Sequence, residues 1–277
     1  MTRPYACALA IAIVTVLSGC ASTPAGETAA SAESSSMPAD AARQDNPLFA
    51  PSPLTLGYPQ FDKIQDSHYG PAFDKGMAEQ LKEMDAIANS GEAPTFENTI
   101  VAMEKSGQLL GRSTAIFFNL SGADTNDARQ KIRAEYAGKL SAHGDAIFLN
   151  DKLYQRVKSL YDRRHALGLD PESVRLIERY HTDFVRSGAA LDETQKARVK
   201  TINTRLAELG NRFSENTLAE VNASAVLFDR KEQLDGLSEG QIAAAADAAK
   251  KAGHDGKYQI ALLNTTGQPP LAELHDR

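Results

Sequence analysis

The stretch from Pro94 to Asp127 most constrains the fold, because its apolar residues recur at the period of an α-helix. Pro94 ends the preceding element, and the Thr95 hydroxyl is suited to cap the free amides of a first helical turn. Alternating spacings of four and three residues relate Phe96, Ile100, Met103, Gly107, Leu110, Thr114 and Phe117. The pattern therefore predicts one helix whose apolar face is buried in a core.

Similar signals predict further helices over about 71–90, 128–143, 151–167 and 171–188. The first of them should carry Phe73, Met77, Leu81, Met84 and Ile87 on one face. Asp192 and Gln195 form a capping-box pattern that opens the longest helix. The apolar face of that helix is predicted on Val199, Ile202, Leu206, Leu209 and Phe213. The segment 47–59 contains four prolines and should be an extended, irregular arm.

Two short β-prone runs lie near the end of the chain, at 225–228 and 258–263. They flank a helix that Ser238 and Gln241 should open, and they predict a small two-stranded element. Another helix should start at Leu271. The predicted fold class is therefore mostly α, with a small two-stranded β element near the C-terminal end.

The first 20 residues have the features of a bacterial lipoprotein signal peptide. Arg3 precedes an uncharged apolar run from Tyr5 to Leu17, which is short for a permanent membrane helix. The run ends in Leu-Ser-Gly-Cys, which resembles a lipobox and predicts lipidation of Cys20; an ordinary signal peptide with an incidental cysteine is the alternative. Residues 21–46 are rich in Ala and Ser and predict a flexible tether. In enterobacterial lipoproteins, which this segment resembles, an aspartate after the cysteine favours the inner membrane; Ala21 at that position implies the outer membrane, facing the periplasm.

Four stretches resemble the N-terminal helical region of the zinc-dependent oligopeptidase family, and within it the bacterial peptidyl-dipeptidase type. The first is PTFENTIVAMEKSG with FFNLSGADTND after it, within 94–127. The others are NPLFAPSPLTLGYPQFDKIQDSHYGPAFDKGM (46–77), AIFLNDKLYQRVKSLYD (146–162) and RLIERYHTDFVRSGAALDE (175–193). The resemblance covers about residue 46 to the last residue. It implies that 47–277 is an N-terminal helical domain that forms one wall of a narrow substrate channel.

The family's zinc site needs His-Glu-x-x-His on a helix, where two histidines four apart bind one metal ion and the glutamate polarises a water. No two histidines of this chain are four apart, since they lie at 68, 143, 165, 181, 254 and 275. The resemblance places the catalytic and zinc-binding residues beyond residue 277, so no catalytic, cofactor or metal residue is predicted here. The pairs Glu178 with His181 and Asp162 with His165 are interpreted as ordinary polar pairs on helices. The sequence also contains no nucleophile elbow and no phosphate-binding glycine loop.

The resemblance implies an N-terminal fragment of a lipid-anchored zinc metallopeptidase that releases dipeptides from the C-termini of oligopeptides. This chain alone is predicted to be inactive. Zinc and oligopeptides belong to the full-length protein, and the chain is expected to be a monomer. Its net charge of -6, with both signs mixed, excludes a basic nucleic-acid surface. A non-catalytic, lipid-anchored helical module that binds peptides or a partner is the alternative, and a structural tether is disfavoured because long heptad repeats are missing.

Overall fold

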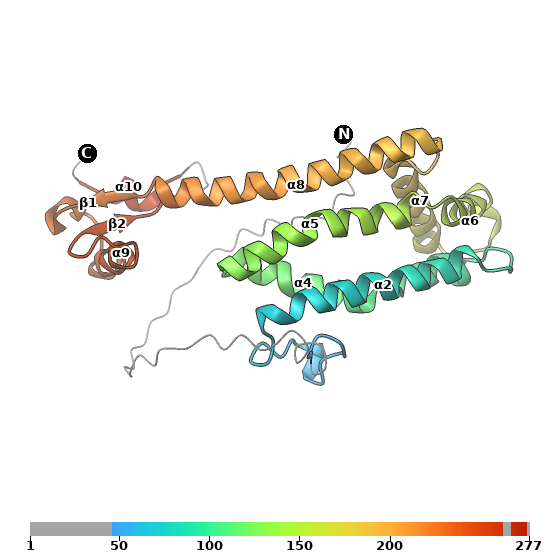
Figure 1. Ribbon diagram of the computed structural model, residues 1–277, viewed down its shortest axis with the longest axis horizontal. Helices are drawn as coiled ribbons and strands as arrows, with labels where there is room; N and C mark the ends of the chain where they lie inside the picture. Colours follow the sequence, from blue (N-terminus) through green and yellow to red (C-terminus); the bar gives the residue numbers. More distant parts are fainter. Residues whose placement is uncertain (1–45, 263–266, 276–277) are drawn as a thin grey trace. The chain divides into compact units, whose positions relative to one another are not determined.

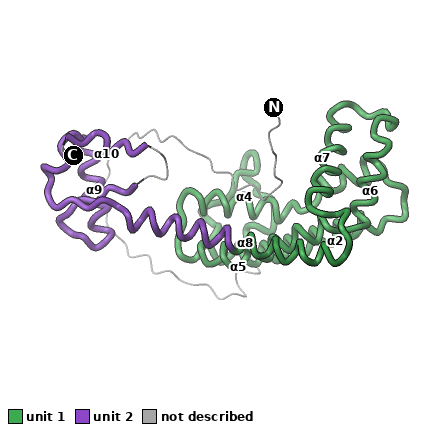
Figure 2. Tube along the Cα trace, turned by 90° about the horizontal axis from the view of Figure 1, so that it is seen from above, with its two compact units in different colours: residues 1–208 green, residues 209–277 purple. Residues whose placement is uncertain are grey.

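The computed structural model describes residues 46–262 and 267–275. Cys20, the predicted signal peptide 1–20 and the predicted tether up to residue 45 lie outside these residues. The chain divides into two compact units, residues 1–208 and 209–277 (Figure 2). Helices predominate in both units, which confirms the predicted mostly α class.

The first unit is a group of helices in which α2 packs against α4, α5 and α6 (Figure 1). Its longer helices are α2 (Tyr69–Ala88), α4 (Gln108–Ala123), α5 (Asp127–Phe148), α6 (Asp151–Asp162), α7 (Pro171–Ser187) and the first part of α8 (Glu193–Ala223). Its shorter turns are η1 (Thr55–Gly57), η2 (Asp66–His68), the π-helix η3 (Phe96–Val101), α3 (Ala102–Glu104) and η4 (Arg164–Ala166).

Side-chain caps start several helices where the sequence predicts them. The Thr95 hydroxyl accepts a hydrogen bond from the Asn98 amide at 3.0 Å. Asp170 caps α7 ahead of a proline at the first helical position, as predicted. Asp192 and Gln195 exchange the two bonds of a capping box, with lengths of 2.8 and 3.2 Å. These predicted helix starts are therefore confirmed.

The prediction of one uninterrupted helix with Phe96 to Phe117 on one face is wrong. The chain forms η3 and α3, leaves the helical path after Glu104, and begins α4 at Gln108. Gly107 lies in the left-handed region at φ 66°, where a residue with a side chain is strained. Its amide donates to Glu83 Oε2 on α2 at 2.7 Å. Because the apolar spacing continues across this break, periodicity alone gave no sign of it.

An aromatic cluster holds α2, α4 and α5 together. The Phe73 ring lies 5.3 Å from the Phe117 ring and 5.1 Å from the Tyr136 ring, both in edge-to-face contact. Tyr69 packs edge-on against Phe117, and the Tyr136 hydroxyl donates to the Gly70 carbonyl at 3.0 Å. A second cluster joins η3, α6 and α7, and its fully buried members are Ile100, Leu153, Val157, Leu160, Ile177 and Phe184.

Helices α2 and α4 pack closely at Gly76. Among the described glycines of these two helices, it is the one whose Cβ position meets the other helix. A Cβ atom on Gly76 would lie 2.8 Å from the Leu110 amide nitrogen. We expect Gly76→Ala to lower the free energy of unfolding by about 1–3 kcal/mol, because the backbone of α4 has to move away. Gly111→Ala on α4 is the matched control, since nothing lies within 4 Å of its Cβ position. Urea denaturation should show the control gaining about 0.5–1 kcal/mol, and a gain in both variants would contradict the close approach.

The predicted apolar face of α8 is exposed in the described structure. Ile202, Leu206, Leu209 and Phe213 are exposed, and Lys196 is the buried residue of this helix. The spacing correctly identifies the side of the helix that is apolar. It does not tell whether another element of this chain covers that side.

The second unit contains the end of α8 followed by β1 (Val226–Phe228), η5 (Lys231–Leu234), α9 (Glu239–Lys251), β2 (Tyr258–Ile260) and α10 (Pro269–Glu273). The two strands pair antiparallel, with Val226 opposite Ile260, which confirms the predicted two-stranded element. A small core of its own contains Leu234, Ile242, Ala245, Ile260 and Leu274. In the part of the chain that the structure describes, no helix combines the length and the apolar character needed to cross a bilayer.

Candidate functional site

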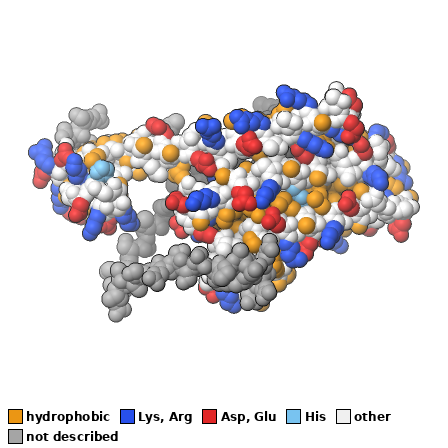
Figure 3. All heavy atoms as spheres, viewed as in Figure 1, with side chains coloured by type: hydrophobic (Ala, Val, Ile, Leu, Met, Phe, Trp, Pro, Cys, Tyr) orange, Lys and Arg blue, Asp and Glu red, His pale blue; other side chains and the backbone are white. Residues whose placement is uncertain are grey.

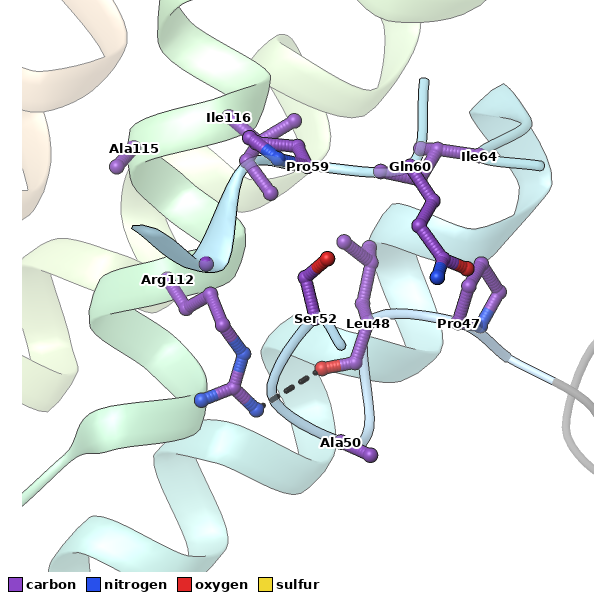
Figure 4. Close-up of a pocket in the computed structure, with 11 residues that line it drawn as sticks. Pro47, Leu48, Ala50, Ser52, Pro59, Gln60, Ile64, Arg112, Ala115 and Ile116 are labelled. Carbon is purple, nitrogen blue, oxygen red and sulfur yellow. Dashed lines mark hydrogen bonds between the residues drawn. The ribbon is translucent and has the colours of Figure 1, made fainter. Parts of the chain in front are cut away.

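The N-terminal arm crosses α4 and encloses a pocket of about 200 Å³ (Figure 4). Apart from η1, residues 47–59 have no regular secondary structure, as the prolines predict. The arm is fixed at its start by Asn46, whose side chain donates to the His68 carbonyl at 2.7 Å. The lining residues are Pro47, Leu48, Ala50, Ser52, Gly57, Pro59, Gln60, Ile64, Arg112, Ala115 and Ile116.

Arg112 is the charged residue of this pocket, and it holds the arm against α4. Its Nη2 donates to the Leu48 carbonyl at 3.1 Å (Figure 4). Its Nη1 donates to the Gln108 carbonyl at 3.2 Å. Its Nε is buried and has no hydrogen-bond partner among the described residues. The Ser52 hydroxyl closes the arm loop by donating to the Tyr58 carbonyl at 2.6 Å.

The lining residues of the pocket suit binding and not catalysis. Leu48, Ile64 and Ile116 supply apolar surface, and Arg112 supplies a fixed positive charge. None of the lining residues is a histidine, a cysteine or a carboxylate, so no general base or metal ligand lines the pocket. No role was predicted for Arg112 from the sequence; a charged residue within a predicted core helix was the available signal.

Glu178 and His181 have separate partners in the structure. Glu178 accepts from Arg164 Nε at 3.0 Å, and this bond lowers the pKa of the carboxyl group. His181 stacks on Tyr161, with 3.8 Å between the ring centres, and burial lowers its pKa. Asp162 and His165 are also separate. Asp162 accepts a hydrogen bond from Lys158 at 2.5 Å, and His165 is exposed.

A zinc ion does not fit the residues that the structure describes. Over 46–262 and 267–275 no three His, Cys, Asp or Glu side chains come together as a group that could bind a metal. Cys20, the predicted lipidation site, lies outside this range. The prediction that the chain by itself carries no catalytic or metal residue stays a prediction.

His143 is a buried histidine between α5 and α2 for which the sequence predicted no role. Its Nε2 lies 2.7 Å from Gln80 Oε1, so the neutral ring donates through Nε2. Its Nδ1 is buried without a partner among the described residues. Burial disfavours the charged ring and lowers the pKa from its ordinary value of 6.5.

We expect His143 to make the first unit less stable in mild acid. As the pH falls through about 6.5, the unfolded chain takes up the proton before the folded chain does, so folding loses free energy. Urea denaturation at pH 7.5 and pH 5 should show this loss, and His143→Gln should reduce it. Burial also lowers the pKa of His68 and His181, so part of the loss remains. His165→Gln, at an exposed position, is the control; an equal reduction in both variants would contradict this role of His143.

Comparison with known proteins finds relatives for most of this chain. The chain is 44% identical over 232 residues to dipeptidyl carboxypeptidase of Escherichia coli, a match that covers 84% of this chain and 34% of that protein. The enzyme of the same name from Salmonella typhimurium gives the same identity and coverage. Oligopeptidase A of Escherichia coli is 26% identical over 205 residues, which are 74% of this chain and 30% of that protein.

These relatives confirm the resemblance to the oligopeptidases that the four sequence stretches indicate. No family model matches the chain. The chain spans about a third of the length of the curated relatives that it matches.

Proposed function

We propose that this relative of dipeptidyl carboxypeptidase and oligopeptidase A is part of a longer zinc metallopeptidase that removes dipeptides from the C-termini of oligopeptides. The observation that carries the proposal is the 44% identity over 232 residues to a protein named dipeptidyl carboxypeptidase. The zinc is inferred from the resemblance to the zinc-dependent oligopeptidases. The match covers 34% of that protein, so the chemistry is assigned to the remaining part. When bound there, zinc supplies Lewis-acid activation of water.

In this enzyme the described helices form one wall of the substrate channel. The reacting groups lie in the rest of the protein. The tightly packed aromatic cluster of α2, α4 and α5 is suited to this role, because a rigid scaffold holds a narrow channel open. Arg112 and the arm pocket add one further binding surface on the same scaffold. No step of the reaction is assigned to a residue of this chain.

Peptide digestion with the full-length polypeptide tests the enzymatic proposal. Mass spectrometry should show loss of two residues at a time from the C-terminus, which stops with a chelator and resumes with zinc. The 277-residue chain is the matched control and should release nothing. Release of single residues, or of dipeptides by the 277-residue chain, would contradict the proposal.

We also propose that Cys20 carries lipid and anchors the protein to the outer membrane, on the periplasmic side. The support is the sequence Leu-Ser-Gly-Cys that closes the apolar run, together with the Ala- and Ser-rich segment that follows it. Two or more acyl chains give stable attachment, whereas one gives marginal attachment. Cys20→Ser should therefore move the protein from the membrane fraction to the soluble fraction, and Cys7→Ser is the control. Retention of the Cys20→Ser protein in the membrane would overturn the anchor.

A further inference from the structure

Helix α8 contacts the rest of the first unit through polar side chains. Lys196 is buried and pairs with Asp151 at the start of α6. About two helical turns further on, Asn203 Nδ2 donates to the buried Asp145 Oδ1 on α5 at 2.6 Å. A surface helix normally places its apolar side against its own protein. In α8 the polar side is used instead, so its apolar side remains uncovered.

The uncovered side is a continuous stripe of four large side chains, which we call the α8 stripe. Its members Ile202, Leu206, Leu209 and Phe213 are exposed to 41%, 60%, 43% and 73%. At about 100° per residue, all four lie within an arc of about 60° on the same helix. Hydrophobic side chains are visible at the surface of α8 in the space-filling view (Figure 3). A contiguous apolar stripe of this kind marks an interaction surface.

The spacing of the α8 stripe fits a partner helix. Together with Val199, its members repeat at intervals of three and four, which are the a and d positions of a heptad. This seam spans two heptads, which is enough for one local helix contact and far less than a long coiled coil. The partner should therefore be an amphipathic helix with its own apolar seam.

A row of arginines borders the stripe on one side. Arg198, Arg205 and Arg212 recur every seven residues, at the g positions of the same heptad. Arg205 pairs with Glu208 at 3.1 Å, and within the described range no ion pair is found for the other two. Side chains at g positions face charged positions of a partner helix. The partner should therefore carry Asp or Glu beside its apolar seam.

The same row makes a second copy of this chain an unsuitable partner. In a parallel pair the g positions face the e positions of the partner, which here are Asn203 and Gly210. In an antiparallel pair they face one another, and arginine would oppose arginine. Neither arrangement provides a carboxylate for the row.

We propose that the α8 stripe docks an amphipathic, acid-bordered helix from the part of the polypeptide beyond residue 277. This inference rests on the proposed function, which assigns a longer chain. The curated relatives support it, since about two thirds of their length lies outside the match. The occupant is thus a segment of the same polypeptide, packed on the apolar side that the described residues leave uncovered.

Thiol labelling of engineered cysteines tests the docking. Leu206→Cys lies on the stripe, and Ala197→Cys is exposed on the opposite side of the same helix. Peptide mass spectrometry should show residue 206 labelled at least about tenfold more slowly in the full-length polypeptide than in the 277-residue chain. Residue 197 should label at similar rates in both. Equal labelling of residue 206 in both lengths would overturn the docking.

Charge reversal tests the acidic border of the partner. In the full-length polypeptide, Arg205→Glu should speed labelling of the cysteine at 206 by about fivefold or more, because like charges now oppose each other. Lys200→Glu, an exposed cation away from the stripe, is the matched control. Equal effects of the two reversals would overturn the acid-bordered partner. Protection at 206 in the 277-residue chain that disappears on dilution would identify a second copy as the occupant and overturn the proposal.

Dipeptide release by the same full-length preparation separates this inference from the proposed function. An active enzyme with an unprotected position 206 would overturn the docking alone. Protection at 206 in a polypeptide that releases no dipeptides would overturn the enzymatic proposal alone.

Discussion

Phe73→Ala is expected to lower the free energy of unfolding of the first unit by about 3–5 kcal/mol, since it leaves a cavity in the aromatic cluster. Phe73 is fully buried, and its ring contacts the rings of Tyr69, Phe117 and Tyr136 from three helices. The neighbouring helices cannot close over a space of this size without moving their own buried side chains. Urea denaturation followed by circular dichroism measures the loss.

Phe118→Ala is the matched control for this prediction. Phe118 is the next residue along α4 from Phe117, and 38% of its side chain is exposed. Its replacement should cost about 1 kcal/mol or less. Equal losses from Phe73 and Phe118 would show that the cluster does not hold these helices together.

Arg156→Met is expected to cost about 3 kcal/mol, because a buried guanidinium organises the loop that joins α2 to η3. Its Nη1 donates to the Ser90 carbonyl at 3.2 Å and to the Glu92 carbonyl at 3.0 Å. Its Nη2 donates to Asn98 Oδ1 at 3.0 Å. Methionine retains much of the side-chain volume, so the lost free energy of unfolding comes from the missing hydrogen bonds and not from a cavity. Denaturation midpoints measure it, and proteolysis between residues 89 and 94 should become faster.

Arg163→Met provides the comparison for Arg156. Arg163 follows the last turn of α6 and donates to the Pro94 carbonyl in the same loop, but its side chain is exposed. Water can replace an exposed donor, so the cost should stay below about 1 kcal/mol. If the two variants lost similar free energies of unfolding, the effect would come from removing a positive charge and not from the buried hydrogen bonds of Arg156.

Local signals in the sequence predicted most helix starts of this fold. The capping side chains bond to amides only three residues ahead, so their effect can be inferred without the tertiary structure; they are Thr95, Asp170 and Asp192. The helix break at Gly107 was missed because the apolar repeat continues in register through it. The deciding contact comes from Glu83, 24 residues earlier, and no local pattern reports it.

The arginine contacts and the α8 stripe were unpredictable for a different reason. Arg112 and Arg156 bind carbonyl groups about 60 residues away in the sequence, and a carbonyl group gives no residue-type signal. For α8 the periodicity correctly gave the apolar side. Whether that side is buried depends on what lies against it, and no described element of this chain does.

The exposed stripe on α8 also has a consequence during synthesis of the polypeptide. Synthesis proceeds from the N-terminus, so any cover encoded downstream is made after α8 itself, and a few hundred residues take on the order of tens of seconds. During that interval the stripe faces every other unfinished chain. Arg198, Arg205 and Arg212 place positive charge within about one helical turn of each stripe residue. Charges next to an apolar segment reduce self-association, and these arginines border the stripe while it is still exposed during synthesis.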